Sequence, residues 1–147
     1  MNLNARSRVR SENGFTLVEM LLVLVILATL AGVVVPRFVD RAEQGRRTAA
    51  KTQIAHFGVS LDCFEVDVGN YPQGGDGLQD LVVQPRDATG WKGPYVKEIP
   101  LDPWGHTYLY ECPSKHGAKA YDLSSVGRDG RAGTDDDITN WQMSQQR

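Results

Sequence analysis

One long apolar stretch stands out from the mixed pattern of hydrophobic and polar residues along the rest of the chain. It runs from Phe15 to Val35, and Glu19 is its one charged residue. At about 1.5 Å of rise per helical residue, its 21 residues would reach about 31 Å, close to the hydrocarbon thickness of a bilayer. The pattern therefore predicts a transmembrane helix over residues 15–35. The polar, arginine-rich residues 1–14 precede it, and we interpret them as a leader outside the fold.

An amphipathic pattern follows Pro36 and predicts that the helix resumes. Four apolar residues are spaced by 3, 4 and 3, as one helix face requires. They are Ile54, Phe57, Leu61 and Phe64. The breaker cluster that begins at Gly69 should end the helix near that residue. A proline inside a helix removes one backbone hydrogen bond, so we expect a kink or local unwinding at Pro36.

The second half of the chain carries shorter patterns that predict a small sheet. Residues 76–82 favour a short helix after the breaker cluster. Two alternating runs, 107–112 and 120–126, predict an antiparallel hairpin, and residues 138–141 predict a third strand. The apolar face of this sheet would cover the amphipathic helix. We therefore expect an α+β fold in which residues 36–147 form one globular domain.

Composition narrows the possible classes of function. The chain has 147 residues, 41% of them hydrophobic, and a net charge of −2, so we expect no nucleic-acid partner. We also expect no enzymatic activity, because the sequence has no nucleophile motif and its histidines lack partners at catalytic spacing. Cys63 and Cys112 could pair after export or remain apart, and their spacing does not suit zinc. The tryptophans are expected to anchor the core or its loops, and the histidines to lie at the surface or in turns. These residues are Trp91, Trp104 and Trp141, and His56, His106 and His116.

An acidic, glycine-rich segment between the second and third predicted strands is the best candidate for a metal site. Between Gly127 and Ile138 it carries four carboxylates within nine residues, together with three glycines. Hard oxygen donors on a flexible loop suit calcium, which takes about 6 to 8 oxygen ligands. The segment lacks the glycine and the glutamate of an EF-hand loop. From the spacing alone, a calcium site and a solvated acidic turn both remain open.

The residues at the start of the apolar stretch resemble a known processing signal. The run from Gly14 to Glu19, Gly-Phe-Thr-Leu-Val-Glu, is similar to the type III signal of type IV pilins and pseudopilins. The resemblance implies a type IV pilin-like fold, cleavage between Gly14 and Phe15 by a prepilin peptidase, and N-methylation of Phe15. An ordinary secretory signal is the alternative, but its apolar region is usually shorter and has no central acid. A buried carboxylate needs a partner, so we expect Glu19 to pair with the new amine of Phe15, in its own or a neighbouring chain, during assembly.

Motifs further along the chain narrow the resemblance to the major pseudopilins of the type II secretion system. They are Tyr71-Pro72, Gly77-Leu78-Gln79, Gly93-Pro94-Tyr95 and, above all, Pro100-Leu101-Asp102-Pro103-Trp104-Gly105. The resemblance implies the major structural subunit of a periplasmic helical filament, the pseudopilus, that drives export of folded proteins across the outer membrane. A type IV pilin or a minor pseudopilin is the nearest alternative. A membrane-anchored enzyme and an anchored calcium-binding module that never polymerises are two further alternatives.

The same resemblance implies partners, a location and a set of metal ligands. The partners are further copies of the chain, the prepilin peptidase, minor pseudopilins, the inner-membrane assembly platform and the membrane itself. The chain would cross the inner membrane once, with its globular domain in the periplasm. In the acidic loop, calcium would be bound by side chains and by backbone carbonyls. The side chains are those of Asp129, Asp136 and Asp137, and the carbonyls are those of Val126, Arg131 and Thr134. Asp135 is a third consecutive acid that departs from the family pattern, so we leave it out of this set.

Overall fold

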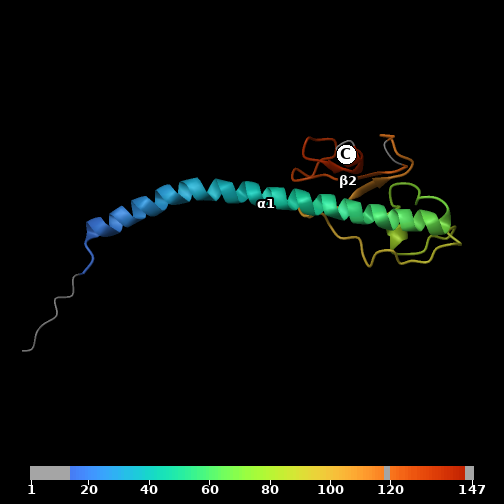
Figure 1. The fold of residues 1–147 in the computed structure, drawn as a ribbon, viewed down its shortest axis with the longest axis horizontal. Helices are drawn as coiled ribbons and strands as arrows, with labels where there is room; N and C mark the ends of the chain where they lie inside the picture. The colour runs from blue at the N-terminus through green and yellow to red at the C-terminus, as the bar shows by residue number, and fades with distance from the viewer. Residues whose placement is uncertain (1–13, 118–119, 145–147) are drawn as a thin grey trace, which may run out of the picture. The chain divides into compact units, whose positions relative to one another are not determined.

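The computed structural model describes residues 14–117 and 120–144, so the predicted leader lies outside the described residues except for Gly14. The chain forms two compact units, Met1–Arg41 and Ala42–Arg147. The elements, which Figure 1 shows in chain order, include two α-helices and one short 3-10 helix. In the described residues they are α1 (Leu17–Val68), η1 (Gln79–Leu81), β1 (Leu109–Glu111), β2 (Asp122–Ser125), β3 (Ile138–Thr139) and α2 (Asn140–Ser144).

Helix α1 ends where the sequence predicts. Val68 is its last residue, and Gly69 follows with a φ of 93°, a left-handed conformation that favours glycine. The N–H of Gly69 donates to the carbonyl of Glu65 at 2.7 Å and so satisfies one terminal acceptor. The backbone stays helical across Pro36, so the expected local unwinding is wrong. Proline removes a single donor, and the 52-residue α1 continues as helix on both sides of it.

The core of the second unit lies between α1 and the sheet. The four predicted residues of the helix face are each at most 2% exposed, so this prediction is confirmed. They pack against side chains of the sheet and of the segment that contains η1. Those side chains include Leu78, Leu81, Tyr108, Tyr110, Tyr121 and Leu123. Burying one such side chain stabilises the fold by about 1.5–3 kcal/mol, so this face fixes the sheet on α1. Figure 1 shows β2 lying along this part of α1.

The sheet has the order β1-β2-β3, and both pairings are antiparallel. Tyr110 lies opposite Leu123 in the first pair, and Ser125 lies opposite Ile138 in the second. This register confirms the predicted hairpin and places β2 at the centre. The acidic loop therefore begins at the end of the central strand and returns directly into β3.

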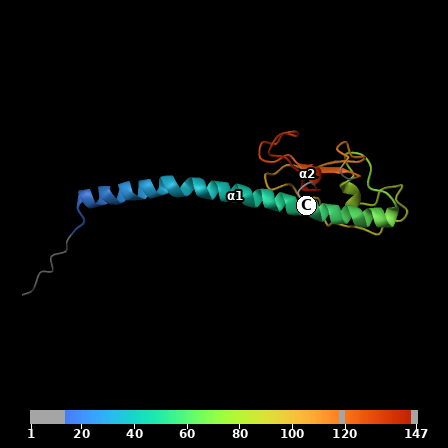
Figure 2. The ribbon, with the colours of Figure 1, turned by 45° about the horizontal axis from the view of Figure 1, so that its top comes forward.

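The third strand is shorter than the sequence predicts. It ends at Thr139, and Asn140 starts α2, so the expected strand over 138–141 is wrong in its second half. The side chain of Asn140 gives the physical reason. Its Oδ1 accepts from the N–H of Leu123 and its Nδ2 donates to the carbonyl of Tyr121, both at 3.0 Å. One side chain thus satisfies backbone groups of Leu123 and of Tyr121, just before β2, where a longer β3 would have done so. Helix α2 packs against β2 and β3 (Figure 2).

Candidate functional site

Helix α1 begins with a reciprocal cap made by Thr16 and Glu19. The Oε2 atom of Glu19 accepts from the N–H of Thr16 at 2.8 Å and from its hydroxyl at 2.9 Å. The hydroxyl oxygen of Thr16 accepts in turn from the N–H of Glu19 at 3.2 Å. This is the capping box that the spacing Thr-x-x-Glu before an apolar run favours, and the sequence reasoning above missed it. Glu19 therefore defines the helix start in the intact chain, and its pairing with a Phe15 amine stays a prediction.

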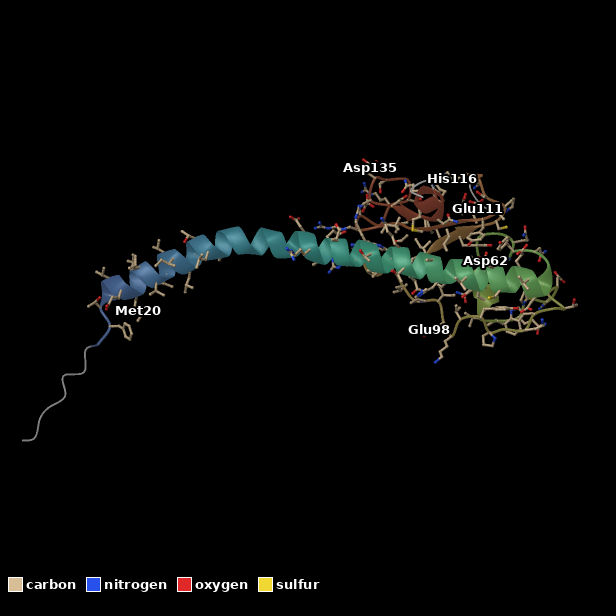
Figure 3. The ribbon with its side chains drawn as sticks, in the orientation of Figure 1. Met20, Asp62, Glu98, Glu111, His116 and Asp135 are labelled. Atoms are coloured by element: carbon tan, nitrogen blue, oxygen red, sulfur yellow. The ribbon has the colours of Figure 1, made fainter. Side chains whose placement is uncertain are left out.

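The apolar side chains that follow this cap are exposed. Phe15 is 80% exposed, and each large apolar side chain from Phe15 to Leu30 is at least 47% exposed. Figure 3 shows Met20 among these side chains on the first turns of α1. A continuous apolar surface of this length marks an interaction site, since water solvates it poorly. Among the residues that the structure describes, none of the helices combines the length and the apolar character that crossing a membrane would need.

The acidic loop brings two of its predicted ligands together. Asp129 and Asp136 both face the hydroxyl of Thr134, whose oxygen lies 3.4 Å from Asp129 Oδ1 and 2.6 Å from Asp136 Oδ1. The other oxygen of Asp136 accepts from the N–H of Asp129 at 3.0 Å. The hydrogen bonds from Thr134 and from the Asp129 amide lower the pKa of Asp136, so this carboxylate is ionised at neutral pH. Two carboxylates thus converge on one small volume.

Asp137 is the last acid of the same loop and is partly buried. Its Oδ2 accepts from the N–H of Gly133 at 2.7 Å, whereas its Oδ1 is buried and has no hydrogen-bond partner. A buried carboxylate oxygen without a partner is costly, and a cation would satisfy it. Asp135 is exposed, and Figure 3 shows it at the outer edge of the loop, directed away from α1.

Two of the three predicted carbonyl ligands accept hydrogen bonds within the loop. The carbonyl of Arg131 accepts from the Thr134 hydroxyl at 3.2 Å, and that of Thr134 accepts from the N–H of Asp137 at 3.2 Å. Val126 is buried where β2 ends. Within residues 14–117 and 120–144, no three His, Cys, Asp or Glu side chains form a ready-made metal cluster. The donor set is all oxygen and strongly acidic, which fits a hard cation such as calcium in its chemistry.

A buried acid outside the loop contacts the residues that start it. The side chain of Asp102 is 0% exposed. Its Oδ1 accepts from the N–H groups of Trp104 and His106 at 3.0 and 2.8 Å, and its Oδ2 accepts from the hydroxyl of Ser125 at 2.6 Å. The sequence marks the motif that contains Asp102 by resemblance alone and gives this acid no role. The structure shows that its acid joins a tight turn to the end of β2.

A second cluster of polar residues lies at the hairpin turn. His116 stacks on Trp141 with ring centroids 4.0 Å apart, and its Nδ1 lies 2.8 Å from Asp122 Oδ2. Burial alone would raise the pKa of Asp122, but hydrogen bonds from Ser114, His116 and the Lys115 amide outweigh it and lower that pKa. This arrangement fastens the turn to α2. The hydroxyl of Ser114 and the ring of His116 both bond to Asp122, and no bond between these two described side chains is seen, so the cluster lacks the serine-to-histidine contact of a Ser-His-Asp triad.

In the described part of the chain, the remaining aromatic, histidine and cysteine residues lie in the core or at the surface and form no site. Trp91 and Trp104 pack against the core, which confirms their expected role as anchors. His56 is exposed on α1. Cys63 is exposed and Cys112 is buried, and both are free thiols.

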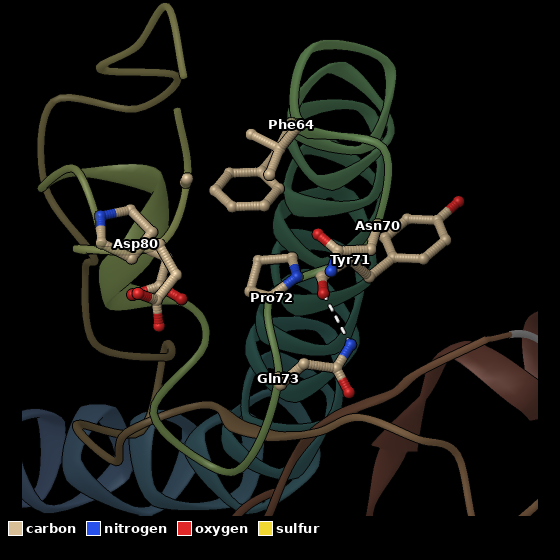
Figure 4. Close-up of a pocket in the computed structure, with 10 residues that line it drawn as sticks. Phe64, Asn70, Tyr71, Pro72, Gln73 and Asp80 are labelled. Atoms are coloured by element: carbon tan, nitrogen blue, oxygen red, sulfur yellow. Dashed lines mark hydrogen bonds between the residues drawn. The ribbon is translucent and has the colours of Figure 1, made fainter. Parts of the chain in front are cut away.

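A pocket lies beside the end of α1. It encloses about 190 Å³ and is lined by Phe64, Tyr71, Pro72 and Asp80 among others (Figure 4). Figure 4 shows the amide of Gln73 donating to the carbonyl of Tyr71, at 2.7 Å. Burial, followed by the nearby charge of Asp76, raises the pKa of Asp80. The lining contains no serine, cysteine or histidine, so the pocket has no nucleophile of the usual kinds.

A long helix that begins with a capped, exposed apolar segment and carries a small antiparallel sheet on its second half defines a type IV pilin-like subunit. The family model described as "Prokaryotic N-terminal methylation motif" matches residues 9–35. The model described as "Type II secretion system (T2SS), protein G" matches residues 37–141. The chain belongs to the family of type II secretion system protein G, which confirms the resemblance to major pseudopilins.

Individual relatives agree with this assignment over nearly the whole chain. The type II secretion system core protein G of Escherichia coli (strain K12) is 40% identical over 140 residues, which cover 92% of this chain and 95% of that protein. The protein of the same name from Pseudomonas aeruginosa is 40% identical over 139 residues, covering 90% and 96%. The crystal structure of the major pseudopilin from the type 2 secretion system of enterohaemorrhagic Escherichia coli matches with a TM-score of 0.64 and 29% identity, over 74% of this chain and 97% of that one. The predicted α+β, pilin-like fold is thereby confirmed.

Proposed function

We propose that this chain is the major structural subunit of a type II secretion pseudopilus, a periplasmic helical filament that drives export of folded proteins across the outer membrane. The observation that carries the proposal is the exposed apolar surface of α1 from Phe15 to Leu30. Before assembly the lipid of the inner membrane would cover this surface. In the filament, the same segments of neighbouring copies would cover it. Because lipid is as apolar as the neighbouring helices, burial against other copies would compensate for leaving the membrane, and helix packing together with the Glu19 pairing would favour the filament.

Processing prepares the chain for this step. A prepilin peptidase would cut between Gly14 and Phe15 and methylate the new N-terminus, while the globular unit remains in the periplasm. Glu19 would then pair with the Phe15 amine of its own or a neighbouring copy and set the axial register. The further partners are minor pseudopilins and the inner-membrane assembly platform. The chain acts as a structural subunit and not as an enzyme, and the names of its relatives support this view.

Mass spectrometry of the chain extracted from membranes tests the processing step. The expected mass lacks residues 1–14 and carries one methyl group on Phe15. An intact leader on the chain in its native envelope would contradict the proposal.

Filament assembly tests the role of Glu19. We expect Glu19→Ala to abolish sedimenting filaments while the leader is still removed, because one unpaired amine would be buried at each subunit contact. Glu98→Ala is the matched control, since Glu98 is an exposed acid of the globular unit. Normal filaments from Glu19→Ala would refute the register role.

Calcium is the cofactor that we propose for the acidic loop. Asp129, Asp136 and Asp137 would supply carboxylate oxygens, and loop carbonyls would complete the shell. The converging carboxylates of Asp129 and Asp136 support this assignment, as does the unpartnered oxygen of Asp137. A bound calcium ion supplies positive charge that neutralises these acids, and it stabilises the folded state by RT ln(1 + [Ca]/Kd).

A further inference from the structure

The turn that contains Asp102 and the loop that contains Asp129 are far apart in sequence but joined in space. The carboxylate of Asp102 accepts a hydrogen bond from the hydroxyl of Ser125. The oxygen of that hydroxyl accepts a second one from the N–H of Gly127, at 3.3 Å. On the other side, the Nδ1 of His106 lies 3.1 Å from the carbonyl oxygen of Gly127. The turn therefore holds both polar backbone groups of Gly127, one through Ser125 and one through His106.

Gly127 is the residue on which the loop turns. Its φ is 65°, a conformation that side chains disfavour, and a Cβ atom there would lie 2.5 Å from the carbonyl oxygen of Asp136. The start of the loop is thus in close contact with the acidic residues that end it. A rotation at Gly127 would move Asp129, two residues further on, relative to Asp136, because the backbone of Asp136 lies against Gly127.

We propose that Asp102 is a positioning residue for the cation site: through Ser125 and His106 it fixes Gly127, so that Asp129 and Asp136 already face one another before a cation binds. This inference rests on the proposed calcium site. It assigns a role to the Pro100–Gly105 motif, which contributes no ligand of its own.

The burial of Asp102 fits this role. A carboxylate without solvent is costly unless each of its oxygens is hydrogen-bonded, and both oxygens of Asp102 are. The two backbone donors of its own turn fix the carboxylate rigidly, so the bond to Ser125 has a fixed direction. The acidic loop itself is mostly exposed and rich in glycine, and it contributes few apolar contacts. Its order must therefore come from polar contacts at its ends, which Asp102 supplies at one end.

Ser125→Ala is the direct test, since it removes the link between Asp102 and Gly127 and keeps both residues. The matched control is Ser124→Ala, its neighbour in β2, which points to the opposite face of the sheet. His106→Ala removes the second link, at a partly exposed position where folding is less at risk. Each full-length, processed chain is measured in detergent with and without calcium.

Two readouts separate loop order from ion binding. In chelator, hydrogen exchange of the Gly127–Asp137 amides should become at least tenfold faster in Ser125→Ala and in His106→Ala than in wild type and in Ser124→Ala. Calorimetric titration with calcium should show about 10- to 100-fold weaker binding for the same two variants, as for other groups that orient metal ligands. If Ser125→Ala does not fold, the His106→Ala result decides.

The possible failures are distinguishable. Wild-type exchange and wild-type calcium affinity in both variants would overturn the positioning role. Weaker binding with unchanged loop exchange would overturn it as well, since the mechanism requires a looser loop. A wild-type chain that binds no calcium would refute the proposed cofactor, and the exchange data in chelator would then decide the positioning role independently.

Discussion

Replacing Asn140 by alanine tests how a single side chain completes the sheet. Asn140 is 5% exposed, and its amide satisfies the N–H of Leu123 and the carbonyl of Tyr121. Alanine would remove the acceptor of the Leu123 N–H in β2 and one donor to the carbonyl of Tyr121, which precedes β2. Each lost hydrogen bond of a buried polar group costs about 1–3 kcal/mol, so the two together should destabilise the folded state by about 2–6 kcal/mol.

The measurement is thermal unfolding of the wild-type and variant chains in the same detergent. For a domain of about this size, 1 kcal/mol lowers the Tm by about 4 °C or more, so we expect a fall of at least about 8 °C. Asn140→Asp keeps the acceptor for Leu123 and loses the donor to Tyr121, and it should show a fall as well. Gln142→Ala is the control, because Gln142 is exposed on the same short helix. A change below about 0.5 kcal/mol for Asn140→Ala would refute the view that this side chain replaces strand pairing.

Three further predictions concern the loop, pH and packing. Calcium should raise the Tm of the wild type and of Asp135→Ala but not of Asp129→Ala, and equal midpoints in calcium and chelator for the wild type would refute the ion site. Because the folded state lowers the pKa of Asp122, its contribution to stability is present above the unfolded pKa of about 4 and lost as pH falls through the folded pKa. Asp122→Asn should therefore flatten the loss of stability in acid, and an unchanged acid profile would contradict this. At Gly90 a Cβ would collide with the Asp67 carbonyl, so Gly90→Ala should destabilise the folded state by about 1–3 kcal/mol. Gly45 lies on the exposed face of α1 with open space around it, so Gly45→Ala should stabilise the folded state by about 0.5–1 kcal/mol. Urea unfolding measures both changes.

The parts of the fold that depend on periodicity could be predicted from sequence. The buried face of α1 follows from the spacing of Ile54, Phe57, Leu61 and Phe64, and its end follows from the glycine at 69. These are local signals, because each depends on residues within one or two helical turns. The hairpin was also found, since its two alternating runs flank a turn cluster.

Features in which a distant side chain, and not a neighbouring strand, binds the backbone could not be predicted from periodicity. The pattern over 138–141 favours a strand, and only the three-dimensional position of Asn140 shows that its amide ends β3 and starts a helix. Asp102 lies 23 residues before the serine that it binds, so no local pattern reveals that contact. The cap made by Thr16 differs, because its spacing to Glu19 is a readable signal that was overlooked.

The acidic loop lies between these cases. Its composition and spacing identified a candidate hard-cation site, and the structure brings Asp129 and Asp136 to one hydroxyl. Which groups of the loop bond to one another could not be predicted, because glycine allows many backbone paths between the same two strands. The contribution of the distant turn at Asp102 is one of the factors that select a single path.

The cap at the start of α1 also bears on what cleavage does to helix electrostatics. The amino end of any helix carries partial positive charge, and a cut after Gly14 would add a full cation one residue before the cap. Two like charges at one tip would favour fraying of the first turn. A carboxylate already fastened over that turn, as Glu19 is, compensates for both, so the mature terminus can stay wound up to its second residue.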